Sequence, residues 1–164
     1  MIGVCRMPEN VEIDKLDVKI LAKLLEDSRI PFRQLARDLG VSESTIYLRV
    51  KRLRSSKVLK GYTADVDLNK LGFLQQAYVE VKVTPQYVRN VVEELREKTN
   101  VIEVYEVSGE YQLLAKIIAT NNEELSSSID EIAMIKGVTE MRVKYVFKTL
   151  ESKNISKVFS RLSL

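Results

Sequence analysis

The chain lacks histidine altogether and has a single cysteine, Cys5, among its 164 residues. Without histidine there is no Ser/His or Cys/His catalytic pair and little prospect of a zinc site, and one cysteine cannot form a disulfide within the chain. No glycine-rich phosphate loop is present, no apolar run is long enough to span a membrane, and the apolar start is too short for a signal peptide. We therefore expect a cytoplasmic protein with no cofactor, no metal site and no membrane partner.

The stretch from Pro31 to Leu59 has the pattern of a helix-turn-helix. Its first half repeats apolar residues at helical spacing, and Gly40 can then take the positive φ that reverses the chain. Ser42 is well placed to cap a second helix, because its hydroxyl can accept a hydrogen bond from an unpaired backbone N–H. The inward face of that helix is predicted to consist of Ile46, Val50 and Leu53. A basic amphipathic helix is often only a solvated surface helix, so this pattern needs support from the rest of the chain.

The polar and basic residues of the second helix are the expected contacts to double-stranded DNA. A helix in the major groove turns one row of side chains toward the bases, while basic side chains neutralise phosphates. The row predicted to approach the bases contains Ser44, Thr45, Tyr47, Leu48 and Lys51, with Ser42 at the start of the helix. The predicted phosphate contacts are Arg49, Arg52, Arg54 and Lys60.

Two flanking segments complete the predicted DNA-binding domain. Upstream, residues 13–29 carry an apolar stripe through Leu16, Ile20 and Leu24, so a third helix can cover the back of the pair. Downstream, residues 57–64 alternate in character around Gly61, which is typical of a small β-wing. Together these segments predict a winged helix-turn-helix over residues 10–63.

The charge is divided unevenly along the chain, although the net charge is only +3. Residues 10–63 contain twelve basic and seven acidic residues, a net charge of +5. Residues 64–150 contain ten basic and fourteen acidic residues, a net charge of −4. A basic first part beside an acidic second part indicates that phosphate is bound by the first part.

After an expected linker at residues 64–73, the periodicity changes to an alternation of strands and helices over residues 74–150. The predicted elements are a strand at 73–83, a helix at 85–98, strands at 101–107 and 113–119, a helix at 121–135 and a strand at 138–149. This β-α-β-β-α-β order predicts a ferredoxin-like sandwich, and the whole chain is of the α+β class. Its helices cover one face of the sheet, so the bare face is expected to pair with a second copy.

The chain resembles the Lrp/AsnC regulators, also called feast/famine regulatory proteins, over roughly residues 13–150. The order and spacing of several short pieces carry the resemblance. In the first half they are Leu16-Asp17, Ile20-Leu21, Ser28-Arg29, Leu35-Ala36, Val41-Ser42, Arg49 to Leu53 and Val58 to Tyr62. In the second half they are Ala77 to Val79, Val107 to Tyr111 and Gly137-Val138.

The resemblance implies a transcriptional regulator whose second half is a RAM domain, a ligand-binding and dimerisation module. Members form homodimers through their sheets, often assemble into tetramers or octamers, and commonly respond to an amino acid held between RAM domains. The implied ligand-binding residues are Gly109, Glu110, Tyr111, Gln112, Thr139 and Met141. Gln112 stands where the family usually has an acid, and Met141 where a second Thr is common. These departures predict weak or absent binding of small neutral amino acids, because an amide no longer supplies the charge that attracts an ammonium.

An enzyme is the alternative interpretation, because siroheme decarboxylases are similar to these regulators in both halves. Their chemistry depends on histidine, which is absent here. Acid pairs remain as candidates for acid–base chemistry at residues 93–94, 123–124 and 130–131, but each lies on a predicted helix where a solvated surface is the simpler interpretation. We therefore do not expect an enzyme.

The last stretch, residues 151–164, extends past the predicted module. Ile155, Val158, Phe159 and Leu162 recur there at helical spacing. This pattern predicts either a tail helix that packs on a neighbour or a loose amphipathic tail.

Overall fold

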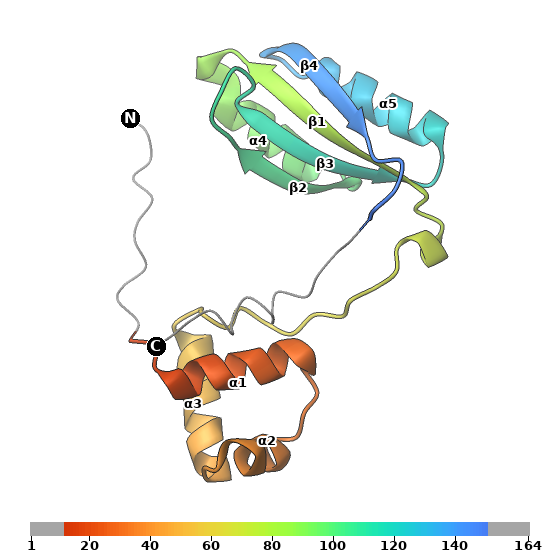
Figure 1. The fold of residues 1–164 in the computed structure, drawn as a ribbon. Coiled ribbons are helices and arrows are strands. Elements are labelled where there is room, and N and C mark those ends of the chain that lie inside the picture. The colour runs from red at the N-terminus through yellow and green to blue at the C-terminus, as the bar shows by residue number, and fades with distance from the viewer. Residues whose placement is uncertain (1–11, 151–164) are drawn as a thin grey trace. The chain divides into compact units, whose positions relative to one another are not determined.

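The computed structural model describes residues 12–150. The chain divides into two compact units, and the described parts of these units are residues 12–65 and 66–150 (Figure 1). The predicted tail at residues 151–164 and the start of the first predicted domain, at residues 10 and 11, lie outside the described residues. In the described part, no helix combines the length and the apolar character that crossing a membrane requires.

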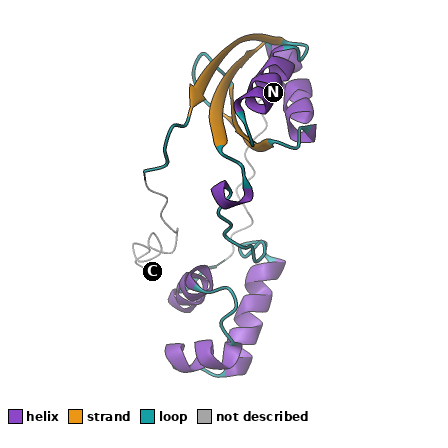
Figure 2. Cartoon of the chain, turned by 90° about the vertical axis from the view of Figure 1, so that its right-hand side faces the viewer, coloured by secondary structure: helices purple, strands orange, loops and turns teal. Residues whose placement is uncertain are grey.

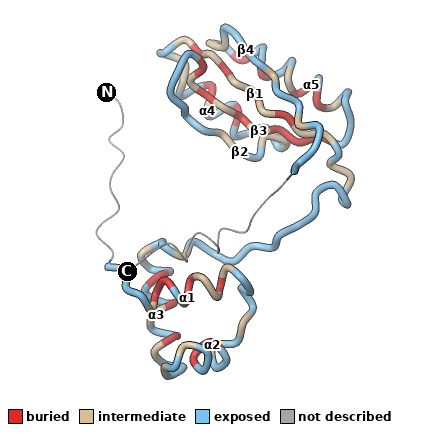
Figure 3. The backbone as a smooth tube through the Cα atoms, viewed as in Figure 1, coloured by how far each residue is buried: buried red, intermediate tan, exposed pale blue. Residues whose placement is uncertain are grey.

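The first unit is a bundle of three helices, α1 (Lys15–Glu26), α2 (Phe32–Leu39) and α3 (Glu43–Ser55). Its core contains Ile20, Leu35, Ile46 and Leu53, all with no solvent exposure, so the predicted inward faces are confirmed. The burial colours of Figure 3 show this core where the three helices face one another.

Local hydrogen bonds explain where these helices begin and end. The Asp14 carboxylate accepts from the backbone N–H of Asp17, and the Asp17 carboxylate accepts from that of Asp14, a reciprocal cap at the start of α1. The Ser42 hydroxyl accepts from the backbone N–H of Thr45 at 3.1 Å, as predicted. Gly40 ends α2 with a φ of 68°, so the predicted turn conformation is confirmed.

The predicted β-wing over residues 57–64 is wrong. Between α3 and the first strand at Gln75, the chain contains a short 3-10 helix, Asn69–Leu71, and no strand (Figure 2). A strand needs an extended partner for its backbone groups, and the described remainder of this unit is helices and short connections. The segment is instead held at its start, where the backbone N–H of Leu59 donates to the carbonyl of Leu53 at 2.9 Å.

The second unit is a four-stranded antiparallel sheet with two α-helices. Its elements are β1 (Gln75–Val83), α4 (Val88–Glu97), β2 (Val101–Glu106), β3 (Leu113–Ala119), α5 (Asn122–Ala133) and β4 (Val138–Tyr145). The strand order β2-β3-β1-β4 confirms the ferredoxin-like prediction. The last strand ends four residues earlier than expected, and the first turn of the helix predicted from residue 85 is a 3-10 helix, Pro85–Tyr87.

The alternation of each strand decides which side chains enter the core. On β1, Val79 and Val81 are fully buried with Leu113 and Ile117 of β3, and the helices add residues such as Leu95. Both helices lie on this side of the sheet (Figure 2). The opposite side carries the residues that alternate with the core, among them Tyr78, Glu80, Lys82, Lys116 and Lys144. We call this side the open face.

Gly137 offers a test of the packing between the start of β4 and the 3-10 helix. A Cβ at this position would lie 2.2 Å from the Cβ of Tyr87, and the backbone has a φ of +104°. We expect Gly137→Ala to destabilise the fold by the roughly 1–3 kcal/mol of a strained backbone plus the cost of moving Tyr87. Gly109→Ala is the matched control, because its φ is +116° and its Cβ would meet nothing within 4 Å. Urea unfolding followed by circular dichroism measures both, and equal losses would contradict the packing argument.

Candidate DNA-binding and ligand-binding sites

The solvent side of α3 displays the residues predicted to approach DNA bases. Ser44, Tyr47, Leu48 and Lys51 are exposed and Thr45 is half-buried. Tyr47 and Leu48 are 54% and 62% exposed, although both are large hydrophobic residues. At the start of the helix, the Ser42 hydroxyl lies 2.8 Å from the hydroxyls of both Ser44 and Thr45. The helix therefore presents an uninterrupted row of hydroxyl, aromatic, aliphatic and basic groups.

Two of the predicted phosphate contacts, Arg49 and Arg52, are ion-paired within the unit. The carboxylate of Asp17 has no solvent exposure and contacts both guanidinium groups, with 3.3 Å between Arg49 Nη1 and Asp17 Oδ2. Arg49 also pairs with Asp14. The backbone N–H of Asp17 and the Arg49 guanidinium lower the pKa of Asp14 to about 2, so this carboxyl stays charged at neutral pH.

The remaining predicted phosphate contacts are differently placed. Arg54 and Lys60 are exposed, as is Lys51, and within residues 12–150 none of the three has an ion pair. Their charges are therefore available to an external anion, whereas those of Arg49 and Arg52 are largely balanced by Asp14 and Asp17.

Asp17 is the functional residue that the residue pattern alone did not single out. A usable signal was present, because an acid lies in the middle of the apolar stripe of the first helix, next to Leu16 and Val18. A carboxylate at such a position must be paired, since burying an isolated charge is very costly. The basic residues of the second predicted helix could have been considered as its partners.

In the second unit, the turn at residues 109–112 is held by Gln112. The Gln112 side-chain oxygen accepts from the backbone N–H of Val83 at 2.9 Å, and its side-chain nitrogen donates to the carbonyl of Glu110 at 3.1 Å. The backbone N–H of Val107 closes the turn by donating to the carbonyl of Gln112. This amide therefore joins the turn to the end of β1, and it does not stand free to orient a ligand.

Glu110 and Tyr111 belong to a charged cluster at the same end of the open face. The ammonium of Lys82 contacts Glu110 at 2.8 Å and Glu140 at 3.4 Å. The Tyr111 hydroxyl donates to Glu140 and lowers the pKa of that carboxyl, while the Arg142 guanidinium lies 4.4 Å from the centre of the Tyr111 ring. Lys82, Glu140 and Arg142 were not predicted. Strand alternation was the signal, since Glu140 and Arg142 pair with Lys82 and Glu80 across β1 and β4.

The two residues implied on the last strand have different surroundings. Thr139 is exposed at a bulge in the β1–β4 pairing, and its hydroxyl donates to the carbonyl of Lys82 at 3.2 Å. Met141 pairs with Val81 and packs against the core on the helix side. Met141 therefore lies on the helix side of the sheet, and its part in a ligand site stays a prediction.

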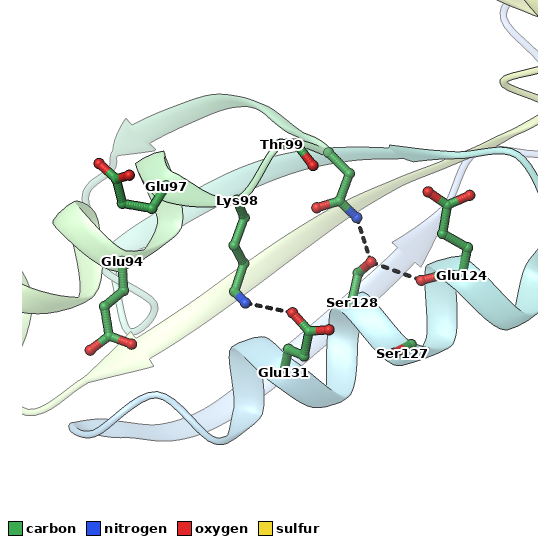
Figure 4. A pocket seen from close by; sticks show the side chains of 9 residues that line it. Glu94, Glu97, Lys98, Thr99, Glu124, Ser127, Ser128 and Glu131 are labelled. Carbon is green, nitrogen blue, oxygen red and sulfur yellow. Dashed lines mark hydrogen bonds and ion pairs between the residues drawn. The ribbon is translucent and has the colours of Figure 1, made fainter.

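The described part of the second unit also has a cavity of ≈ 620 Å³ between α4 and α5, away from the open face. Figure 4 shows Lys98 between Glu94 and Glu97 on one side and Glu131 on the other, with Glu124 farther along α5. The Lys98 ammonium contacts Glu131 at 2.7 Å. At its inner edge the Ser128 hydroxyl donates to the carbonyl of Glu124 at 2.8 Å. The acids predicted to be solvated are exposed here or half-buried, so the surface interpretation of the three acid pairs is confirmed.

Comparisons with known proteins agree for both units. Residues 13–54 match a family model described as the AsnC-type helix-turn-helix domain, and residues 76–155 match one described as the Lrp/AsnC ligand binding domain. The HTH-type transcriptional regulator FL11 of Pyrococcus horikoshii is 37% identical over 139 residues, covering 85% of this chain and 92% of that protein. The regulator LrpA of the same organism is 34% identical over 140 residues, covering 85% and 99%. The structure of Escherichia coli AsnC shares the fold, with a TM-score of 0.84 and 24% identity over 89% of this chain and 99% of that one.

Asp17→Asn tests whether the buried carboxylate holds the first unit together. The substitution leaves the shape of the side chain but removes the charge that balances two guanidinium groups. We expect the free energy of unfolding to fall by about 1 to 3 kcal/mol, which is less than for a fully buried pair because Arg52 is partly exposed. Asp38→Asn, an exposed acid on α2, is the control and is expected to change stability by less than about 0.5 kcal/mol. Thermal unfolding measures both variants, and equal effects would rule the argument out.

Proposed function

The chain belongs to the Lrp/AsnC family of DNA-binding transcriptional regulators, and from this premise we propose how its residues divide the work. The observation that carries the proposal is the exposed row on α3, from Ser44 to Lys51, on a helix whose back is locked by Asp17. In a helix-turn-helix the second helix enters the major groove. The proposed base contacts are Ser42, Ser44, Thr45, Tyr47, Leu48 and Lys51.

The basic residues are proposed to act in two ways. Arg54 and Lys60 neutralise phosphates directly, since no carboxylate among the described residues pairs with them. Arg49 and Arg52 first orient α3 through Asp14 and Asp17. A guanidinium has five donors, so their remaining N–H groups can still contact a phosphate.

A second copy of the chain is the proposed partner of the open face. Across this face Lys144 pairs with Glu80, Lys82 with two acids, and Lys116 lies 3.6 Å from Glu103 and 5.9 Å from the ring of Tyr78. Such exposed pairs contribute little in water, so exchanging them for contacts with a second copy costs little. A homodimer would present two copies of α3 to a palindromic site whose halves lie one or more helical turns apart, and tetramers or octamers would multiply them.

An amino-acid effector is proposed to act weakly on this chain. The match of residues 76–155 to a ligand-binding domain supports an effector site on the second unit. We propose the turn of residues 109–112 as its position, as the family resemblance implies. At that turn Glu110 and Glu140 are already paired with Lys82, and the Gln112 amide is already bonded to the backbone. A small neutral amino acid must break these contacts before its own ammonium and carboxylate can be bound.

We propose a regulator and not an enzyme. The relatives FL11 and LrpA are named transcriptional regulators, and the decarboxylase alternative finds no support among them. The proposed location is the cytoplasm, which is consistent with a DNA-binding regulator.

Arg54→Ala and Lys60→Ala test the DNA interface. The probe is a fluorescent duplex selected for binding from a random-sequence pool. Each variant is expected to weaken binding and to lower the slope of log affinity against log salt by about 0.9, the value for one lost phosphate contact. Lys19→Ala, at an exposed basic residue on α1, is the control and should leave the slope unchanged. Fluorescence anisotropy over a range of salt concentrations gives both quantities, and unchanged slopes in the Arg54 and Lys60 variants would refute the assignment.

Light scattering tests the proposed dimer. The protein is expected to be at least dimeric at micromolar concentration, and Tyr78→Glu on the open face is expected to shift it toward monomer by placing an unpaired charge in the interface. Glu93→Lys, on the exposed side of α4, should leave the mass unchanged. A monomeric unmodified protein would overturn the proposal, whereas a tetramer or octamer agrees with it.

Calorimetry with alanine, leucine and glutamine tests the effector site. We expect no binding at micromolar concentrations, because the charged groups at the turn already satisfy one another. Gln112→Glu is the informative variant, since it restores an acid at the position where the family usually has one. Micromolar binding by the unmodified protein would show that the internal ion pairs do not close the site.

A further inference from the structure

The exposed side of α3 carries two large hydrophobic residues next to each other, Tyr47 and Leu48. Leu48 follows Ser44 by four residues and precedes Lys51 by three, so these three residues share one side of the helix. The fully buried Ile46 lies on the other side. The row of proposed base contacts therefore has an apolar, solvent-exposed side chain at its centre.

The hydroxyl groups at the start of α3 discriminate poorly between bases. A serine or threonine hydroxyl both donates and accepts, so it can bond to donors and acceptors alike on the base edges. Here the Ser42 hydroxyl also lies 2.8 Å from those of Ser44 and Thr45, and it accepts from the backbone N–H of Thr45. These hydroxyls help to build the start of the helix and leave most sequence discrimination to other side chains.

Side chains that identify a base by two hydrogen bonds are scarce on this helix. Arginine or lysine identifies guanine in this way, and asparagine or glutamine identifies adenine. Residues 43–55 contain no asparagine and no glutamine. The guanidinium groups of Arg49 and Arg52 contact the Asp17 carboxylate. In the row itself, Lys51 remains as a residue of this kind, and Leu48 is the side chain whose recognition chemistry is still unassigned.

Thymine is the base that an apolar side chain can recognise. Its C5-methyl group is exposed in the major groove, where base edges otherwise present hydrogen-bond donors and acceptors. We propose that Leu48 packs against the methyl group of a thymine, so that the stretch of DNA read by one α3 contains a thymine at this position. This inference rests on the proposed entry of α3 into the major groove, and it names the base chemistry that is read there.

Deoxyuridine isolates this contact, because it lacks the methyl group of thymine and keeps the same hydrogen-bonding edge. In the duplex selected from the random-sequence pool, each thymine is replaced in turn, and fluorescence anisotropy measures the affinity. At one thymine for each α3, the replacement is expected to weaken binding by the unmodified protein about four-fold, the factor for burying one carbon group. Leu48→Ala is expected to bind the thymine and deoxyuridine duplexes equally at that position. Leu48→Met keeps an apolar side chain and should restore the preference for thymine.

Leu71→Ala is the matched control, because Leu71 is a leucine with the same exposed fraction, 62%, and lies outside α3. It should keep both the affinity and the preference for thymine, and circular dichroism checks that each variant is folded. Equal binding of every deoxyuridine duplex by the unmodified protein would overturn the inference and leave DNA binding intact, as would a preference that survives Leu48→Ala. A pool from which no binding duplex is recovered would instead refute DNA binding by α3, and this inference with it.

Discussion

The buried carboxylate of Asp17 is the constraint on which the DNA-reading unit depends. A charge without solvent exposure must be balanced where it lies, so Arg49 and Arg52 are held against it. These contacts connect the start of α1 to the middle of α3, and they thereby set the direction in which the exposed row of α3 points. The same contacts reduce the positive charge that this basic helix offers to phosphate. Phosphate binding is therefore left mainly to the basic residues that form no ion pair among the described residues.

The second unit also pairs carboxylates with cationic side chains, but at positions where solvent weakens the attraction between the charges. On the open face, each carboxylate of the cluster at residues 110 and 140 has a cationic neighbour, and Tyr111 adds a hydrogen bond. Because these pairs are exposed, they arrange the surface without contributing much stability. They also mean that a charged ligand or a second copy must compete with contacts that already exist. The ion pairs of Asp17 are fixed and those of the open face can be exchanged, and this difference follows from burial alone.

Periodicity predicted most of this fold, and its failures have identifiable causes. The helices of the first unit and all six main elements of the second appear in the predicted order, because each has a buried face that repeats at 3.6 or 2 residues. The wing failed because alternation over a few residues cannot supply the partner strand that pairing requires. The place of Met141 could not be predicted in the same way, because a resemblance aligns positions along the chain, whereas the face of a strand that a residue occupies depends on the register, here its pairing with Val81.

The sequence by itself determined the class of the fold, the family, the place of the DNA-reading helix and the row of residues on its exposed side. Local spacing and capping carry that information. Gly40 ends α2 and Ser42 caps the start of α3. Only the tertiary structure decided that Asp17 holds two arginines, that Gln112 is bonded to the end of β1, and that Lys82, Glu140 and Arg142 surround Tyr111. Each of these contacts joins residues about 30 or more positions apart, and their distance along the chain carries no trace of the distance in space.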